Sequence, residues 1–155
     1  MDLYQGLRSP PVFWPLLLFL DAGASHRAGR PADGLRTLDA AIDMMRVGPG
    51  TTVLPELYLL KGDLLAALSA DDGSGRSGAE RWYRLAFDRA GELNARMSRL
   101  RAATRLCRLW RDRAEADPDV DMLDIVYATF TEGFATADLL EARDLLAAPG
   151  PSSAT

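Results

Sequence analysis

The chain alternates between segments with the apolar periodicity of a helix and short segments rich in glycine and proline. In residues 31–45 the apolar side chains recur at intervals of three and four, which places them on one face of an α-helix. The same periodicity predicts helices over 53–70, 79–93, 96–114, 120–130 and 137–147. Strand-period alternation is absent from the sequence, so we expect an all-α fold.

Glycine and proline mark where these helices should end. "GRP" at 29–31 combines a helix-stopping glycine with a proline suited to the first turn of the next helix. "RVGPGTT" at 46–52, "DDGSGRSG" at 71–78 and "ADPD" at 116–119 are also predicted breaks, the second of them a flexible loop. The tail 149–155, "PGPSSAT", is expected to be disordered, which leaves one domain over 1–148.

The stretch "VFWPLLLFLDAGA" at 12–24 has three conceivable roles. Its apolar run stops at Asp21, well short of the roughly 20 residues that a membrane helix needs. As a secretion signal it is poor, because prolines interrupt it and Asp2 offsets the basic charge of Arg8. We therefore expect it to form the first helix of a soluble, cytoplasmic protein.

A spacing of small and large residues recurs along the chain. Gly34-x-x-x-Leu38-x-x-Ala41 returns 45 residues later as Ala79-x-x-x-Tyr83-x-x-Ala86, with a weaker copy at 119–126. The helix before each copy also carries a small residue where the two helices would cross, namely Ala22, Gly62 and Thr104. Small residues allow close helix approach, so the pattern predicts about three stacked tetratricopeptide-like hairpins in a right-handed α-α superhelix.

Composition places the chain among ordinary globular proteins, and its charge is unevenly distributed. It has 155 residues, 48% hydrophobic and 26% charged, with a net charge of −4. Residues 76–111 hold ten arginines against three acids, whereas 112–155 hold ten acids against two arginines. A basic middle beside an acidic end either neutralises itself within the fold or makes a polarised surface.

Candidate catalytic and metal-binding residues are few. The single histidine, His26, precedes the "AGRP" turn, where a cap or surface role is the simpler interpretation. The single cysteine, Cys107, falls on the apolar stripe of its helix and is expected to be a core residue. We therefore expect no catalytic residues, no metal site and no cofactor; "GPGTT" at 48–52 also lacks the lysine of a phosphate-binding loop.

The C-terminal third is similar to a known family. "LRAATRLCRLWRDRAEAD" at 100–117 and "IVYATFTEGFATADLLEARDLLAA" at 125–148 resemble the C-terminal tetratricopeptide-like repeats of bacterial multidomain predicted ATPases that carry cyclase or transcriptional-regulator domains. "FTEGF" followed by "TADL" is the most specific part, and the resemblance extends over about 10–148. It implies a protein-interaction or regulatory module without the ATPase, cyclase or DNA-binding domains. Asp119 departs from the family pattern, which expects a small residue there.

A concave groove would be the partner-binding surface of such a stack. Counting from Thr104 predicts that Arg101, Arg105 and Arg108 point into it. Counting from Gly62 adds three residues of the 53–70 helix: Glu56, Leu59 and Asp63. The arginines either hold a carboxylate-bearing peptide or pair with Glu56 and Asp63 on the neighbouring hairpin.

Several partners fit these patterns. A protein or peptide would bind in the groove or at the apolar N-terminal hairpin, and a homodimer through that hairpin is a further expectation. A small ligand held in the groove is the alternative function. Nucleic-acid binding by the arginine-rich helix is disfavoured, because the acids after residue 111 repel phosphate. No membrane association is expected.

Overall fold

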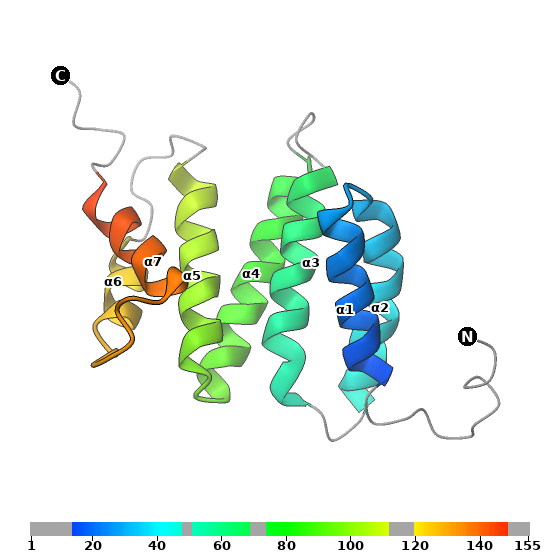
Figure 1. Ribbon diagram of the computed structural model, residues 1–155, viewed down its shortest axis with the longest axis horizontal. Coiled ribbons are helices and arrows are strands. Elements are labelled where there is room, and N and C mark those ends of the chain that lie inside the picture. Colours follow the sequence, from blue (N-terminus) through cyan, green and yellow to red (C-terminus); the bar gives the residue numbers. More distant parts are fainter. Residues whose placement is uncertain (1–13, 48–50, 69–73, 112–119, 149–155) are drawn as a thin grey trace.

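The computed structural model describes residues 14–47, 51–68, 74–111 and 120–148, and this part of the chain is all-α. It contains no strand. Its elements are α1 (Trp14–Arg27), α2 (Pro31–Val47), the short 3-10 helix η2 (Thr51–Val53), α3 (Leu54–Leu68), α4 (Ser74–Glu92), α5 (Arg96–Arg111), α6 (Val120–Tyr127) and α7 (Ala137–Ala147). Figure 1 shows the helices standing side by side in a row, with α1 and α2 together at one end, α3, α4 and α5 in the middle, and α6 and α7 together at the other end.

One continuous core runs along this row, because each apolar cluster is shared by three or more neighbouring helices. The first cluster joins α1, α2 and α3, the second α3, α4 and α5, and the third mainly α5, α6 and α7. Tyr58 packs against the first two clusters, and Phe87 and Met122 pack against the last two. Each helix therefore depends on its neighbours to cover its apolar face.

Two small residues of the sequence pattern, Gly62 and Gly34, lie where neighbouring helices approach closely, as predicted. A Cβ atom added to Gly62 on α3 would lie 2.3 Å from the ring of Tyr83 on α4. A Cβ atom added to Gly34 on α2 would lie 3.0 Å from the backbone oxygen of Ala22 on α1. The other small residues of the pattern are buried: Ala22, Ala41, Ala79, Ala86 and Thr104.

The predicted break at 29–31 is confirmed. Helix α1 ends at Arg27, Gly29 has a φ of 70°, and Pro31 begins α2. The amide of Arg30 donates a hydrogen bond to the carbonyl oxygen of Ser25 at 2.9 Å, which closes the helix end. Glycine suits this turn because it adopts positive φ without a steric penalty.

The flexible loop predicted over 71–78 is wrong in its second half, because α4 already begins at Ser74. Gly78 is helical and packs close to α3: a Cβ atom there would lie 3.5 Å from Leu65. Tertiary contact therefore overrides the low helix propensity of two glycines. The expected disordered tail and the departure at Asp119 lie outside the described residues.

None of the helices in the described segments is both long enough and apolar enough to cross a lipid bilayer.

Candidate functional site

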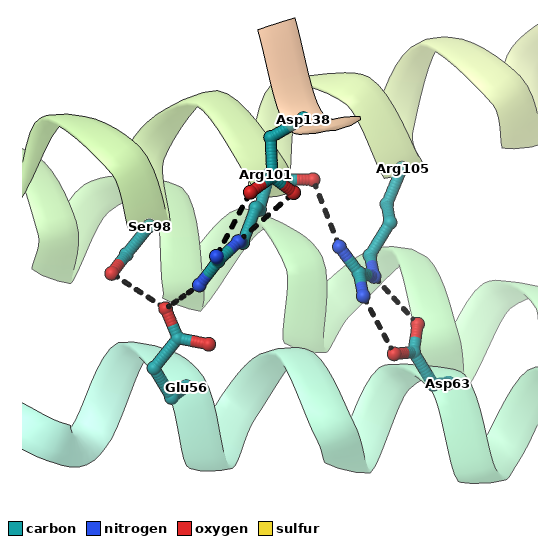
Figure 2. Close-up of polar contacts among 6 residues, drawn as sticks. All are labelled: Glu56, Asp63, Ser98, Arg101, Arg105 and Asp138. Carbon is teal, nitrogen blue, oxygen red and sulfur yellow. Dashed lines mark hydrogen bonds and ion pairs between the residues drawn. The ribbon is translucent and has the colours of Figure 1, made fainter. Parts of the chain in front are cut away.

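A charged cleft of about 310 Å³ lies where α3, α4, α5 and α7 meet. Its lining combines acidic, basic and apolar side chains: Asp63, Ala66, Tyr83, Arg105, Arg108, Leu109, Asp138 and Glu141. Two of the three predicted groove arginines and Asp63 are among them. Figure 2 shows the neighbouring polar contacts, in which side chains from α3, α5 and α7 point toward one another.

Arg101 on α5 joins three helices through two carboxylates. Its Nε and Nη2 atoms donate to Asp138 on α7 at 3.1 and 2.9 Å, and its Nη1 donates to Glu56 on α3 at 3.1 Å. The hydroxyl of Ser98 donates to the same Glu56 oxygen at 2.7 Å. The hydrogen bonds that Arg101 donates to Asp138, together with the attraction of both carboxylates, raise the pKa of Arg101.

Arg105 makes a bidentate pair with Asp63. Its Nε and Nη2 atoms donate to the two carboxylate oxygens at 2.7 and 3.0 Å, the geometry in which a guanidinium and a carboxylate bind most strongly. Burial lowers the pKa of Arg105, but the hydrogen bonds and charge of Asp63 more than offset this and raise it overall. The phenol of Tyr83 on α4 donates to the same carboxylate at 2.9 Å.

Arg108 is the most exposed of the three arginines and pairs with Glu141 on α7 at 2.6 Å. An exposed pair of this kind contributes only about 0–1 kcal/mol to stability. All three predicted groove arginines are therefore held by carboxylates of the same chain. The pairing of Arg101 with Glu56 and of Arg105 with Asp63 confirms the intramolecular alternative for these contacts.

Leu59 was expected in the groove, and the structure corrects this. Its side chain is 2% exposed and packs in the second core cluster, beside residues of α4 and α5. At about 100° per residue, Leu59 lies only about 60° from the crossing residue Gly62, whereas Glu56 lies about 120° from it. Arg101 has the same spacing from Thr104 but reaches the surface because its long side chain ends in a charge.

Asp138 and Glu141 are site residues that the sequence analysis did not name. Both lie on α7, far from α5 in the sequence, and both bind its arginines. The signal for them is the acidic C-terminal segment that follows the basic middle of the chain. The two segments meet here and neutralise each other, which is one of the two outcomes expected from the charge distribution.

The residues considered as candidates for catalysis or metal binding lie apart from one another in the described part of the chain. Within them no group of three or more histidine, cysteine or acidic side chains is placed to hold a metal ion. Cys107 is buried in the third core cluster, as predicted. His26 lies in the last turn of α1, remote in the row from the cleft. What the cleft can do is bind charged groups that compete with its internal ion pairs.

Tyr83 provides a test of the cleft geometry through its ionisation. Burial, then the charge and hydrogen bond of Asp63, raise the pKa of its phenol far above the ordinary tyrosine value. Above about pH 10 the folded chain thus holds a proton that the unfolded chain loses, and stability falls as pH rises. In an ultraviolet titration we expect Tyr83 to ionise only on unfolding.

Tyr83→Phe is the matched variant for this titration. It should remove one late-ionising tyrosine from the curve and flatten the loss of stability above about pH 10. A Tyr58→Phe variant serves as control, because it leaves the Asp63 contact in place. Ionisation of Tyr83 near its ordinary pKa in the folded protein would show that the contact with Asp63 is not formed.

No family model matches the chain, and neither does a curated protein or a solved structure.

Proposed function

We propose that the chain is a non-catalytic, tetratricopeptide-like protein-interaction module of a bacterial cytoplasmic regulator, and that a partner helix docks on the outer face of α1. In this proposal α1–α2, α3–α4 and α5–α6 are three successive hairpins of a right-handed superhelix, and α7 continues the row. The family resemblance of residues 10–148 supports the regulatory setting. The argument for the docking surface rests on the register of the repeats.

The crossing residues Ala22, Gly62 and Thr104 align α1, α3 and α5 with one another. In this alignment Leu17 and Leu20 of α1 correspond to Leu57 and Leu60 of α3. Both α3 leucines pack in the first core cluster, which contains the apolar side chains of the preceding helix α2, and Leu57 is only 1% exposed. On α5 the position of Leu20 is taken by Ala102, which is buried with residues of α4.

The observation that carries the proposal is the exposure of these positions on α1. Leu17 and Leu20 are each 54% exposed, and Leu16 beside them is 44% exposed. Both positions are packed against a preceding helix on α3, and the Leu20 position is buried on α5, whereas both positions are open on α1. Burying a leucine side chain contributes about 1.5–3 kcal/mol, so a helix that covers both would gain substantial binding energy.

The charge at this face indicates what the partner helix carries. Lys61 on α3 pairs with Asp39 on the preceding helix α2 at 2.5 Å. In the aligned register Lys61 corresponds to Asp21 of α1, which is exposed. If a partner helix docks on α1 in the way that α2 docks on α3, one residue of that helix occupies the position equivalent to Asp39. This residue would lie next to Asp21. We therefore propose a partner helix with an apolar stripe and a lysine or arginine at that position.

Two peptides and a charge-swapped protein test this proposal. The first peptide has the sequence of residues 31–47, and the second is the same with Asp39→Lys. By fluorescence anisotropy the wild-type protein should bind the lysine peptide more tightly, and an Asp21→Lys protein should prefer the unchanged peptide. Leu20→Glu should weaken the binding of both peptides by more than about tenfold. Leu85→Glu, which changes an exposed leucine on α4, should leave the binding of both peptides unchanged.

Absence of saturable binding, or a preference that Asp21→Lys leaves unchanged, would overturn the proposal. If the chain instead forms a dimer, measured by its mass in solution, and Leu20→Glu abolishes that dimer, the partner on α1 is a second copy of the chain and not a foreign helix.

The cleft remains the second candidate surface, for a peptide or a small ligand, and its volume of about 310 Å³ supports that alternative. Any anionic partner there must displace Asp63 from Arg105 or Glu141 from Arg108.

A further inference from the structure

A second, smaller cavity of about 220 Å³ lies between the end of α4, the start of α5 and the end of α6. Its lining is Ala90, Gly91, Asn94, Arg96, Arg99, Ile125, Val126 and Thr129. Arg99 lies roughly opposite Arg101 around the helix axis, at about 100° per residue. The cavity is thus on a different face of α5 from the charged cleft.

The charge of this cavity differs from that of the cleft. It presents two guanidinium groups, Arg96 and Arg99, and none of the described residues that line it is acidic. Within the described segments no ion pair joins either arginine to a carboxylate, whereas Arg101, Arg105 and Arg108 are all paired. Two like charges at one cavity without a counter-charge favour binding of an anion.

Arg99 is held in place at the wall of the cavity. Its guanidinium lies over the ring of Phe87, 4.5 Å from the ring centroid, and its buried Nε has no hydrogen-bond acceptor in the described structure. A Cβ atom added to Gly91 would lie 3.5 Å from the guanidinium carbon, so the backbone of α4 closes one side. A fixed guanidinium loses little conformational entropy when it binds an oxyanion.

The opposite wall is apolar and partly open to solvent. Ile125 on α6 is 66% exposed, which is high for a large aliphatic side chain, and it adjoins the buried Val126 and Ala90. An apolar wall facing two cations matches a ligand with a charged head and a small apolar body. At this volume, below the usual range for drug-sized ligands, the body must be short.

We propose that this cavity binds a small organic anion, a carboxylate or a phosphate monoester attached to a short apolar group. Arg96 and Arg99 would hold the oxyanion by charge-assisted hydrogen bonds, and the apolar group would cover Ile125. The site is independent of the helix-docking surface on α1, so either proposal can fail without the other.

Calorimetric titration of the full chain with benzoate and with phenyl phosphate tests the proposal. We expect saturable binding of at least one of them, and at least tenfold weaker binding of benzamide, which has the same ring without the charge. Arg99→Met should weaken binding at least tenfold while it keeps the side chain against Phe87. Ile125→Glu places a carboxylate beside the arginines at an exposed position and should also abolish binding.

Arg27→Gln is the matched control, because it removes an exposed arginine of α1 and should leave the affinity unchanged. The proposal is overturned if neither anion binds, or if Arg99→Met and Ile125→Glu bind benzoate or phenyl phosphate as the wild type does. Inorganic phosphate that binds as tightly as phenyl phosphate would overturn the assignment to an organic anion. Circular dichroism of both variants confirms that they are folded before titration.

Discussion

Replacing Gly62 with alanine is expected to lower the free energy of unfolding by about 2–3 kcal/mol, although alanine is the better helix former. The new Cβ atom would lie 2.3 Å from the Tyr83 ring, so one of the two helices must move. The ring has little freedom to retreat, because it is 5% exposed and its hydroxyl is hydrogen-bonded to Asp63. Movement would also disturb the bidentate contact of Asp63 with Arg105.

Gly78→Ala is the control for this substitution. A Cβ atom at position 78 would lie at an ordinary contact distance of 3.5 Å from Leu65, so the gain in helix propensity is not opposed. We expect this variant to be as stable as the wild type or more stable, by up to about 1 kcal/mol. Urea unfolding of both variants gives the comparison. Equal stability of Gly62→Ala and Gly78→Ala would mean that α3 and α4 do not cross at Gly62.

Much of the fold follows from local sequence patterns. The helix of residues 31–45 has a clear apolar stripe, its start is fixed by Pro31, and its end by a glycine-rich break, so its prediction needs no tertiary information. The crossing residues Gly62 and Gly34 are also predictable, because close approach of two backbones requires small side chains. The start of α4 is different: it depends on contact with Leu65 of α3, which local propensity does not contain.

The cleft was predictable only in part, for reasons that concern how helices are placed. Arg101 contacts Glu56 and Arg105 contacts Asp63, and counting along the helices from Thr104 and Gly62 finds both contacts. Asp138 reaches Arg101 from α7, whose position depends on the irregular segment 128–136. No repeat pattern specifies that segment, so its contribution appears only in the folded structure.

The error at Leu59 shows where counting along an ideal helix stops being sufficient. Residues three positions before a crossing residue, such as Leu59 before Gly62 and Arg101 before Thr104, lie at the border between the core and the groove. A leucine at this border turns into the core, whereas an arginine extends outward to a carboxylate. The chemistry of the side chain therefore decides which way a border residue faces.

The proposed docking surface depends most on the alignment of α1 with α3, in which α1 is open where α3 is covered. Leu17→Ala and Leu57→Ala are the same substitution at corresponding positions, one 54% and the other 1% exposed. Truncation of a buried leucine costs about 2–5 kcal/mol, whereas an exposed one changes stability by about 0.5 kcal/mol or less.

Urea unfolding of these two variants beside the wild type is the most direct measurement. We expect Leu57→Ala to lose several kcal/mol of stability and Leu17→Ala to stay close to the wild type. A loss at Leu17 as large as that at Leu57, measured on the monomeric chain, would show that α1 is already covered and would contradict the account.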